Sequence, residues 1–360
     1  NWEALSLSFP DFIENIISKF VNASTADGYN PYRIMQNGID WESPDPDDPW
    51  AYIGYWGDHQ IAYLQSLLEL SDKYHPGKID ELLGKEIFAY ANVPYRIKGY
   101  EELLKDPHNT IDFDEELDSL IDQRVAAVGA DGRLIWDKND SVYNVNLTEK
   151  LLATVLSKLS NFIPEAGIWM NTQRPEWNDA NNALVGYGVS MVTLYYTRRY
   201  QQYLLDLFSE VEFDQVEIST ELVELLNSIN STFVDNRHLL EGKISDTDRR
   251  LILDRLGRAA DSFRAGLYSH GFAGGRVAVE TSQLIAFCQT SLEFIDHSIR
   301  ANRRQDGLYH AYNLMTATED GIEITYLYEM LEGQVAVLSS GYLSPEESLV
   351  VLEALRQSAL

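Results

Sequence analysis

The sequence contains little sulfur chemistry, since Cys288 is the single cysteine among 360 residues. A disulfide needs two cysteines and a thiolate zinc site needs several, so we expect neither within this chain. Cys288 lies in the apolar run LIAFCQTSLEF, which predicts a buried structural thiol. The seven histidines show no HExxH or HxH spacing, so we predict no metal site and no cofactor.

Basic residues are scarce as well, because 28 Lys and Arg face 56 Asp and Glu, which gives a formal net charge of −28. A chain this acidic is repelled by phosphate backbones and anionic membrane surfaces, so we expect no nucleic acid partner. The absence of a run of about 18 apolar residues and of a basic-then-apolar leader predicts a soluble protein with no membrane partner. The cytoplasm is favoured among compartments, and the oligomeric state stays open.

Apolar residues three and four apart dominate the chain and predict helices. The predicted helices lie at about 12–21, 59–74, 77–92, 114–128, 147–162, 178–211, 216–234, 245–269, 277–302 and 344–358. Residues 23–50 carry several Gly and Pro and predict a long loop. The last helix shows no C-cap before Leu360, and the chain begins at Asn1, so we expect an excised part of a longer chain.

Strand signals are few, and they predict at most a small β-ribbon from RLIW at 133–136 and IEITYLY at 322–328. Some predicted helices are apolar all round and others are amphipathic, which suits an inner and an outer ring of helices. We therefore predict the all-α class and a single domain over residues 1–360, built as an (α/α) toroid.

All seven tryptophans lie in the first 177 residues, mostly in predicted loops. They are Trp2, Trp41, Trp50, Trp56, Trp136, Trp169 and Trp177. An indole beside carboxylates offers a flat apolar face to a sugar ring and charged oxygens to its hydroxyls. This asymmetry favours an oligosaccharide or glycoside as the ligand over plain packing of the indoles.

The most informative local segment is QRPEWND at 173–179, where Glu176 and Asp179 flank Trp177. A carboxyl held against an aromatic wall and away from water has its acid form favoured, which a general acid in glycosidic cleavage requires. The alternative is that Asp179 simply caps the helix that follows. Spacing alone leaves both roles open.

The string EWND followed by ANNALVG resembles the DWND segment of the cellobiose and chitobiose phosphorylase family. That resemblance implies an (α/α)6 barrel, a fold that the wider clan shares with glucoamylase-like enzymes. It also implies that Asp179 acts as general acid beside Trp177. Glu176 stands where the family has Asp, and Glu176 and Arg174 are candidates for substrate binding.

A second segment, IGYWGDHQ at 53–60, resembles the region that binds sugar hydroxyls at the cleaved unit in those families. The family's arginine is absent there, and Trp56 or Gly57 occupies its place. The resemblance implies Asp58 as a hydroxyl acceptor and Trp56 as its neighbour in the glycone pocket. His59 is a further binding candidate, with helix capping as the alternative for both Asp58 and His59.

A hydrolase also needs a base that activates water, and the candidates are Glu329 and Glu332, in the late segment where this clan usually places it. A phosphorylase needs no base, because inorganic phosphate enters as co-substrate and attacks the anomeric carbon. We predict inverting cleavage of a glucoside-like saccharide, with hydrolysis favoured because no phosphate-binding motif occurs. The alternative is a non-catalytic saccharide-binding or scaffolding helical toroid.

Overall fold

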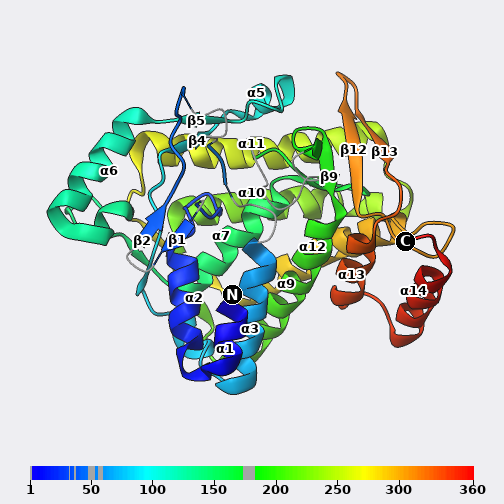
Figure 1. Cartoon of the computed structure of the whole chain (residues 1–360), viewed down its shortest axis with the longest axis horizontal. Helices are drawn as coiled ribbons and strands as arrows, with labels where there is room; N and C mark the ends of the chain where they lie inside the picture. The colour runs from blue at the N-terminus through cyan, green and yellow to red at the C-terminus, as the bar shows by residue number, and fades with distance from the viewer. Residues whose placement is uncertain (1, 32, 36–37, 48–52, 56–59, 173–182) are drawn as a thin grey trace.

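The computed structural model describes residues 2–31, 33–35, 38–47, 53–55, 60–172 and 183–360 (Figure 1). Helices account for 56% of the described residues and strands for 16%. The N-terminal helices gather around the start of the chain at the bottom of the view, and α13 and α14 lie near its end at the right.

Helices of mixed length and short strands make up the described part of the first 145 residues. The helices are α1 (Trp2–Ser8), η1 (Pro10–Phe12), α2 (Ile13–Asn22), α3 (Gln60–Tyr74), α4 (Asp80–Leu83), α5 (Tyr100–Lys105), α6 (Glu115–Val128) and η2 (Gly129–Arg133). The strands form antiparallel pairs, which are β1 (Arg33–Met35) with β2 (Gly38–Asp40), β3 (Phe88–Ala89) with β6 (Asn144–Val145), and β4 (Tyr95–Ile97) with β5 (Ile111–Phe113).

The longest of the described helices lie after residue 145. The described helices of this part are α7 (Leu147–Leu159), α9 (Met191–Glu210), α10 (Thr220–Asp235), η3 (Arg237–Glu241), α11 (Asp246–His270), α12 (Thr281–Ala301), α13 (Leu331–Ser339) and α14 (Pro345–Gln357). Several of these helices begin directly after a capping serine. The hydroxyls of Ser190, Ser245 and Ser344 each accept a hydrogen bond from the backbone N–H of the residue three positions later. Helix α9 packs on α12, and α10 packs along α11 at the top of the view (Figure 1).

A curled antiparallel sheet of five strands lies among these helices. Its order is β13 (Ile322–Tyr326), β12 (Tyr312–Ala317), β9 (Gly188–Ser190), β8 (Gly167–Trp169) and β7 (Phe162–Ile163). A separate pair joins β10 (Gln215–Ser219) to β11 (Arg276–Glu280). The sheet therefore brings residues from 162 to 326 side by side.

The prediction of an all-α (α/α)6 toroid is wrong, because this sheet and the antiparallel pairs are part of the fold. Strand β9 occupies part of the predicted helix 178–211, and β10 and β11 occupy the starts of the predicted helices 216–234 and 277–302. The predicted helix 77–92 contains the short helix α4 and, after it, strand β3. The IEITYLY ribbon is confirmed in part, since β13 pairs with β12.

The strands escaped prediction because they are two to six residues long and several run directly into a helix. Over five residues, the alternation in QVEIS and RVAVE cannot be distinguished from the first turn of an amphipathic helix by periodicity alone. Pairing with a strand about 60 residues away decides the conformation, as in Val216 opposite Val279.

The main apolar core runs from Ile13 to Val351 and includes Cys288. The prediction of a buried thiol is confirmed, and burial raises the pKa of Cys288. Within the described ranges, none of the helices is both long and apolar enough to cross a membrane.

Candidate functional site

Helix α7 is the centre of the candidate site, because all 13 of its residues are buried although several are polar. Lys150, Thr154, Ser157 and Lys158 lie three and four positions apart, so they share one face of the helix, and Asn161 continues that face just beyond it. Buried polar side chains must find partners. The partners of this polar face come mainly from residues 23–30, which we call the 23–30 loop.

The 23–30 loop is buried along its whole length on the polar face of α7. The Lys150 ammonium donates to the Ser24 carbonyl (3.1 Å), and the Ser157 hydroxyl donates to the Gly28 carbonyl (3.2 Å). Gly28 has a φ of +87°, and a Cβ there would lie 2.6 Å from the Ser157 Cβ. The close approach of loop and helix therefore requires glycine at position 28.

Tyr29 links the loop to two other segments. The Asn161 side-chain NH₂ group donates to the Tyr29 hydroxyl (3.0 Å), and the Asn171 side-chain NH₂ group donates to the side-chain oxygen of Asn161 (2.7 Å). On its other side, the Tyr29 ring stacks on Tyr55, with centroids 5.3 Å apart and planes 23° apart. The four residues form an unbroken series of contacts from Tyr55 through Tyr29 and Asn161 to Asn171, which we call the Tyr55–Asn171 chain.

Charged groups border this chain. The Lys158 ammonium lies 4.6 Å from the centre of the Tyr29 ring, within the range of a cation–π contact. Asp27 accepts hydrogen bonds from Thr25 and from the Tyr268 hydroxyl, the latter at 2.6 Å. Burial raises the pKa of Tyr268, and the neighbouring Asp27 charge adds to that shift, so the phenol stays protonated as a donor.

The sequence-predicted residues of the two motifs lie outside the described residues. They are Trp56, Asp58, His59, Arg174, Glu176, Trp177 and Asp179. Tyr55 lies inside the first motif segment, directly before the predicted residue Trp56, and Asn171 stands two positions before the second segment. Because both belong to the Tyr55–Asn171 chain, two described residues close in sequence to the predicted side chains are linked by a short series of contacts.

The two candidate bases are described. Glu329 forms an ion pair with Arg304 (3.0 Å), which also binds Asp306 (2.8 Å). The Asp306 bond and then the Glu329 charge raise the pKa of Arg304. Glu332 lies in the first turn of α13, and its charge adds to the burial that raises the pKa of Tyr196. Within the described contacts, neither carboxylate belongs to the Tyr55–Asn171 chain.

The described tryptophans differ in their surroundings. Trp169 is 2% exposed and donates its indole N–H to the Gly186 carbonyl (2.8 Å), so it is a core residue rather than a sugar platform. Trp41 donates to Asp118 (3.0 Å) and lies under Arg133, and Trp136 lies under Arg124. Trp41 therefore contacts a carboxylate, whereas the charged neighbour of Trp136 is a cation.

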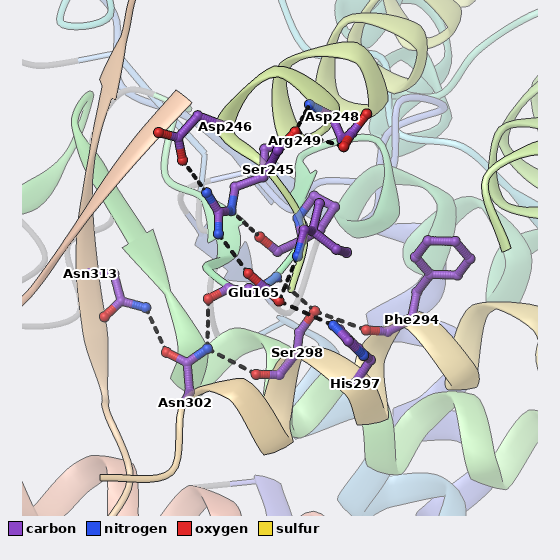
Figure 2. A network of polar contacts seen from close by, with 12 residues as sticks. Glu165, Ser245, Asp246, Asp248, Arg249, Phe294, His297, Ser298, Asn302 and Asn313 are labelled. Carbon is purple, nitrogen blue, oxygen red and sulfur yellow. Dashed lines mark hydrogen bonds and ion pairs between the residues drawn. The ribbon is translucent and has the colours of Figure 1, made fainter. Parts of the chain in front are cut away.

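A second buried carboxylate, Glu165, lies between the sheet and two helices (Figure 2). It occupies the turn between β7 and β8 with a φ of +58°, which is uncommon for a residue other than glycine. Its carboxylate accepts from Arg249 (2.6 Å), from the Ile244 N–H (3.0 Å) and from His297 (3.2 Å). Burial alone would raise the pKa of Glu165, but these three hydrogen bonds together hold it below its usual value.

The side chains around Glu165 join the turn between β7 and β8 to helices α11 and α12 and, through Asn302, to strand β12. Asn302 donates to the Glu165 carbonyl (2.8 Å) and accepts from Asn313 (2.9 Å) on β12. Figure 2 shows Arg249 of α11 on one side of the carboxylate and His297 of α12 on the other. With side chains only 4% and 5% exposed, Arg249 and Glu165 form a buried ion pair with a structural role.

A third carboxylate, Glu149, is buried at the start of α7. It accepts from the Ser219 N–H (2.8 Å), the Ser219 hydroxyl (2.6 Å) and the Tyr90 hydroxyl (3.1 Å). Burial outweighs these bonds and raises the pKa of Glu149. Arg276 approaches it at 3.3 Å and ties β11 to α7.

Sequence reasoning missed Asp27, Tyr29, Asn161 and Asn171. The predicted loop 23–50 contains Asp27 and Tyr29, and since loops usually lie at the surface the sequence does not indicate that residues 23–30 are buried. The available signal was the polar stripe in α7, where Lys150, Ser157 and Lys158 stand among leucines and other apolar residues.

Among the described side chains, no group of three or more His, Cys, Asp or Glu is arranged to hold a metal ion. The absence of a cofactor stays a prediction.

Comparison with protein-family models finds no match, and comparison with curated proteins finds none either.

Proposed function

We propose that the chain cleaves a glycosidic bond of a glucoside-like saccharide with inversion, using Asp179 as the general acid. The proposal starts from the EWND resemblance and from the carboxyl–indole–carboxyl pattern at residues 176–179. Asp58, with Trp56 and His59, would bind hydroxyls of the sugar on the non-reducing side of the cleaved bond. Trp177 would form an apolar wall, flanked by Glu176 and Arg174.

One observation supports joining the two motifs in one site, namely the Tyr55–Asn171 chain. Tyr55 stacks on Tyr29 at 5.3 Å, and Asn171 reaches Tyr29 through a single side chain, Asn161. Two intermediate side chains therefore connect Tyr55 to Asn171. Trp56 follows Tyr55 directly and Arg174 follows Asn171 by three positions, which supports treating the two segments as parts of one site.

In the proposed reaction, the Asp179 carboxyl transfers its proton to the glycosidic oxygen while the bond from that oxygen to the anomeric carbon breaks. A nucleophile attacks the opposite face of the anomeric carbon, which inverts its configuration. In hydrolysis the nucleophile is water, which loses a proton to a carboxylate base about 6.5 to 9.5 Å from the acid.

The identity of the base separates hydrolysis from phosphorolysis. Glu329 and Glu332 are the sequence candidates, and Glu329 is already paired with Arg304 at 3.0 Å. This ion pair occupies one of the two Glu329 carboxylate oxygens. Phosphorolysis needs no such base, so inorganic phosphate belongs in the test.

The experiment is a panel of α- and β-linked glucosides, incubated with and without inorganic phosphate, with the anomer of the released sugar followed by NMR. The proposal expects the anomer opposite to that of the substrate. Release without phosphate identifies a hydrolase, and phosphate-dependent release of a sugar phosphate identifies a phosphorylase. Saccharide binding without any bond cleavage would overturn the enzymatic proposal and leave a saccharide-binding protein.

A further inference from the structure

Arg264, in the second half of α11, is a buried cation that no described residue meets with a counter-charge. It is 6% exposed, and it makes no hydrogen bond or ion pair with any residue that the structure describes. Its Nε–H is fully buried and unpartnered. An N–H group withdrawn from water in this way is costly unless another polar group meets it.

Arg264 lines a small hollow between the 23–30 loop and helices α7, α10 and α11. The other lining residues are Ala26, Asp27, Tyr29, Ala153, Ser157, Ser160, Leu222, Leu225, Ala260 and Phe263. The centre of a water molecule can occupy about 10 Å³ of this hollow. That is the smallest volume in which a single water molecule fits.

Asp27 is the anionic group on the same hollow. Its carboxylate accepts from Thr25 and Tyr268, and a carboxylate has about four acceptor positions, so acceptor capacity remains. Arg264 and Asp27 do not form a direct ion pair within 4.0 Å, although both are more than nine-tenths buried. When two polar groups line the same hollow without direct contact, a bridging water is a common solution.

The charges around the hollow select its occupant. The Asp27 carboxylate disfavours an anion, the Arg264 guanidinium disfavours a cation, and the volume excludes anything larger than water. An empty hollow would leave the Arg264 Nε–H unsatisfied, whereas water can accept from a donor and donate to acceptors at once.

We propose that this hollow is a hydration site for one ordered water molecule, which accepts from the Arg264 Nε–H and donates to the Asp27 carboxylate. The second O–H of the water donates a hydrogen bond to the hydroxyl oxygen of Ser157, on α7, or of Ser160, directly after α7. The water then completes a solvent-separated ion pair that fastens the 23–30 loop to α11. This bridge does not depend on whether the chain cleaves saccharides.

The direct test is a high-resolution crystal structure of the unmodified protein. The expected result is a well-ordered water within about 2.7 to 3.2 Å of both the Arg264 Nε and an Asp27 carboxylate oxygen. An empty hollow, or an Arg264 side chain in direct contact with Asp27, would overturn the proposal.

A second test fills the hollow from a lining residue that is not part of the bridge. Ala260→Val adds two methyl groups at the hollow, and Ala265→Val makes the same change at an exposed position of α11. If water is present, Ala260→Val expels it and lowers the Tm by at least about 2 °C more than Ala265→Val does. If the hollow is dry, filling it raises the Tm above that of the control, and the proposal fails.

A third test measures the coupling across the water. Arg264→Met, Asp27→Asn and the double variant form a thermodynamic cycle, and the double variant should lose less stability than the two single losses added together. Additive losses would show that the two residues do not interact and would contradict the bridge. If a single variant does not fold, the crystal structure and the Ala260→Val comparison still decide.

Discussion

Asn161 donates a hydrogen bond of 3.0 Å to the Tyr29 hydroxyl, although 132 residues separate the two in sequence. Asn161 also accepts from Asn171, and Tyr29 stacks on Tyr55, so this single bond closes the Tyr55–Asn171 chain. The proposed function draws on that chain, because Tyr55 directly precedes Trp56 of the first motif segment and Asn171 stands two positions before the second segment. The position of Tyr29 in turn depends on how the 23–30 loop lies on α7.

Gly28→Ala should therefore disturb the loop. The backbone φ of +87° is costly for alanine, and the new Cβ would overlap with Ala153 and Ser157 of α7, so we expect a loss of more than about 2 kcal/mol. Denaturant unfolding measures this loss. Gly266→Ala is the matched control, because Gly266 lies in α11 with open space around it and should gain about 0.5 to 1 kcal/mol. Equal effects of the two changes would contradict the close approach at Gly28.

Glu165→Gln should destabilise the protein by about 3 kcal/mol, because it leaves the buried Arg249 guanidinium without its main partner. This is the low end for a buried pair, since Asp246 still faces Arg249. The exposed pair Arg356–Glu353 supplies the control, and Glu353→Gln should change stability by less than about 0.5 kcal/mol. A loss for Glu165→Gln as small as that of the control would show that the network in Figure 2 does not stabilise the fold.

The two buried glutamates should respond to pH in opposite directions. Folding lowers the pKa of Glu165. Its contribution to the free energy of unfolding is therefore present above the unfolded pKa of ~4.3 and is lost as the pH falls through the folded value. The pKa of Glu149 is raised, so its contribution declines as the pH rises from ~4.3 through the folded value. Unfolding free energies from pH 3 to 8 should show a shallower acid loss in Glu165→Gln and a shallower decline on the alkaline side in Glu149→Gln. Identical pH profiles in both variants would contradict these assignments.

The sequence predicted the long helices well and the strands poorly, for physical reasons that individual residues illustrate. The predicted helix at 245–269 agrees with α11 because Ser245 caps it and its apolar residues follow the helical period over 25 residues. Ser190, in contrast, both ends strand β9 and caps α9, so the predicted long helix ran through a strand. Strand β9 pairs with β8, at least 20 positions earlier in the sequence, and with β12, more than 120 positions later. No local sequence pattern contains either pairing.

The site was predicted only through its motifs. The EWND and IGYWGDHQ strings drew attention to the segments that follow Asn171 and Tyr55, but nothing in those strings points to Tyr29 or Asn161. Their roles arise from a buried loop on a buried helix, and burial of a Gly- and Asp-containing loop is a tertiary property. Asp27 was missed for the same reason.

Trp177→Ala and Trp56→Ala should weaken saccharide binding more than they lower stability, because both indoles are proposed to contact sugar rather than core. Trp169→Ala is the reference for a core indole and should cost about 3 to 5 kcal/mol, since Trp169 is 2% exposed. Calorimetric titration with a bound saccharide and thermal unfolding give the two readouts. If either variant loses as much stability as Trp169→Ala while binding is unchanged, that tryptophan is a core residue.

The turnover of Asp179→Asn tests the proposed function most directly, measured on the best glucoside of the panel at saturating substrate. Removal of a general acid should lower turnover by at least about 10²-fold while the protein remains folded, because acid catalysis contributes on the order of 10² to 10⁴. Asp320→Asn, an exposed change in the turn between β12 and β13, should retain the activity of the unmodified protein. An Asp179→Asn variant that keeps more than half of that turnover would contradict the assignment of Asp179 as the acid and, with it, the proposed mechanism.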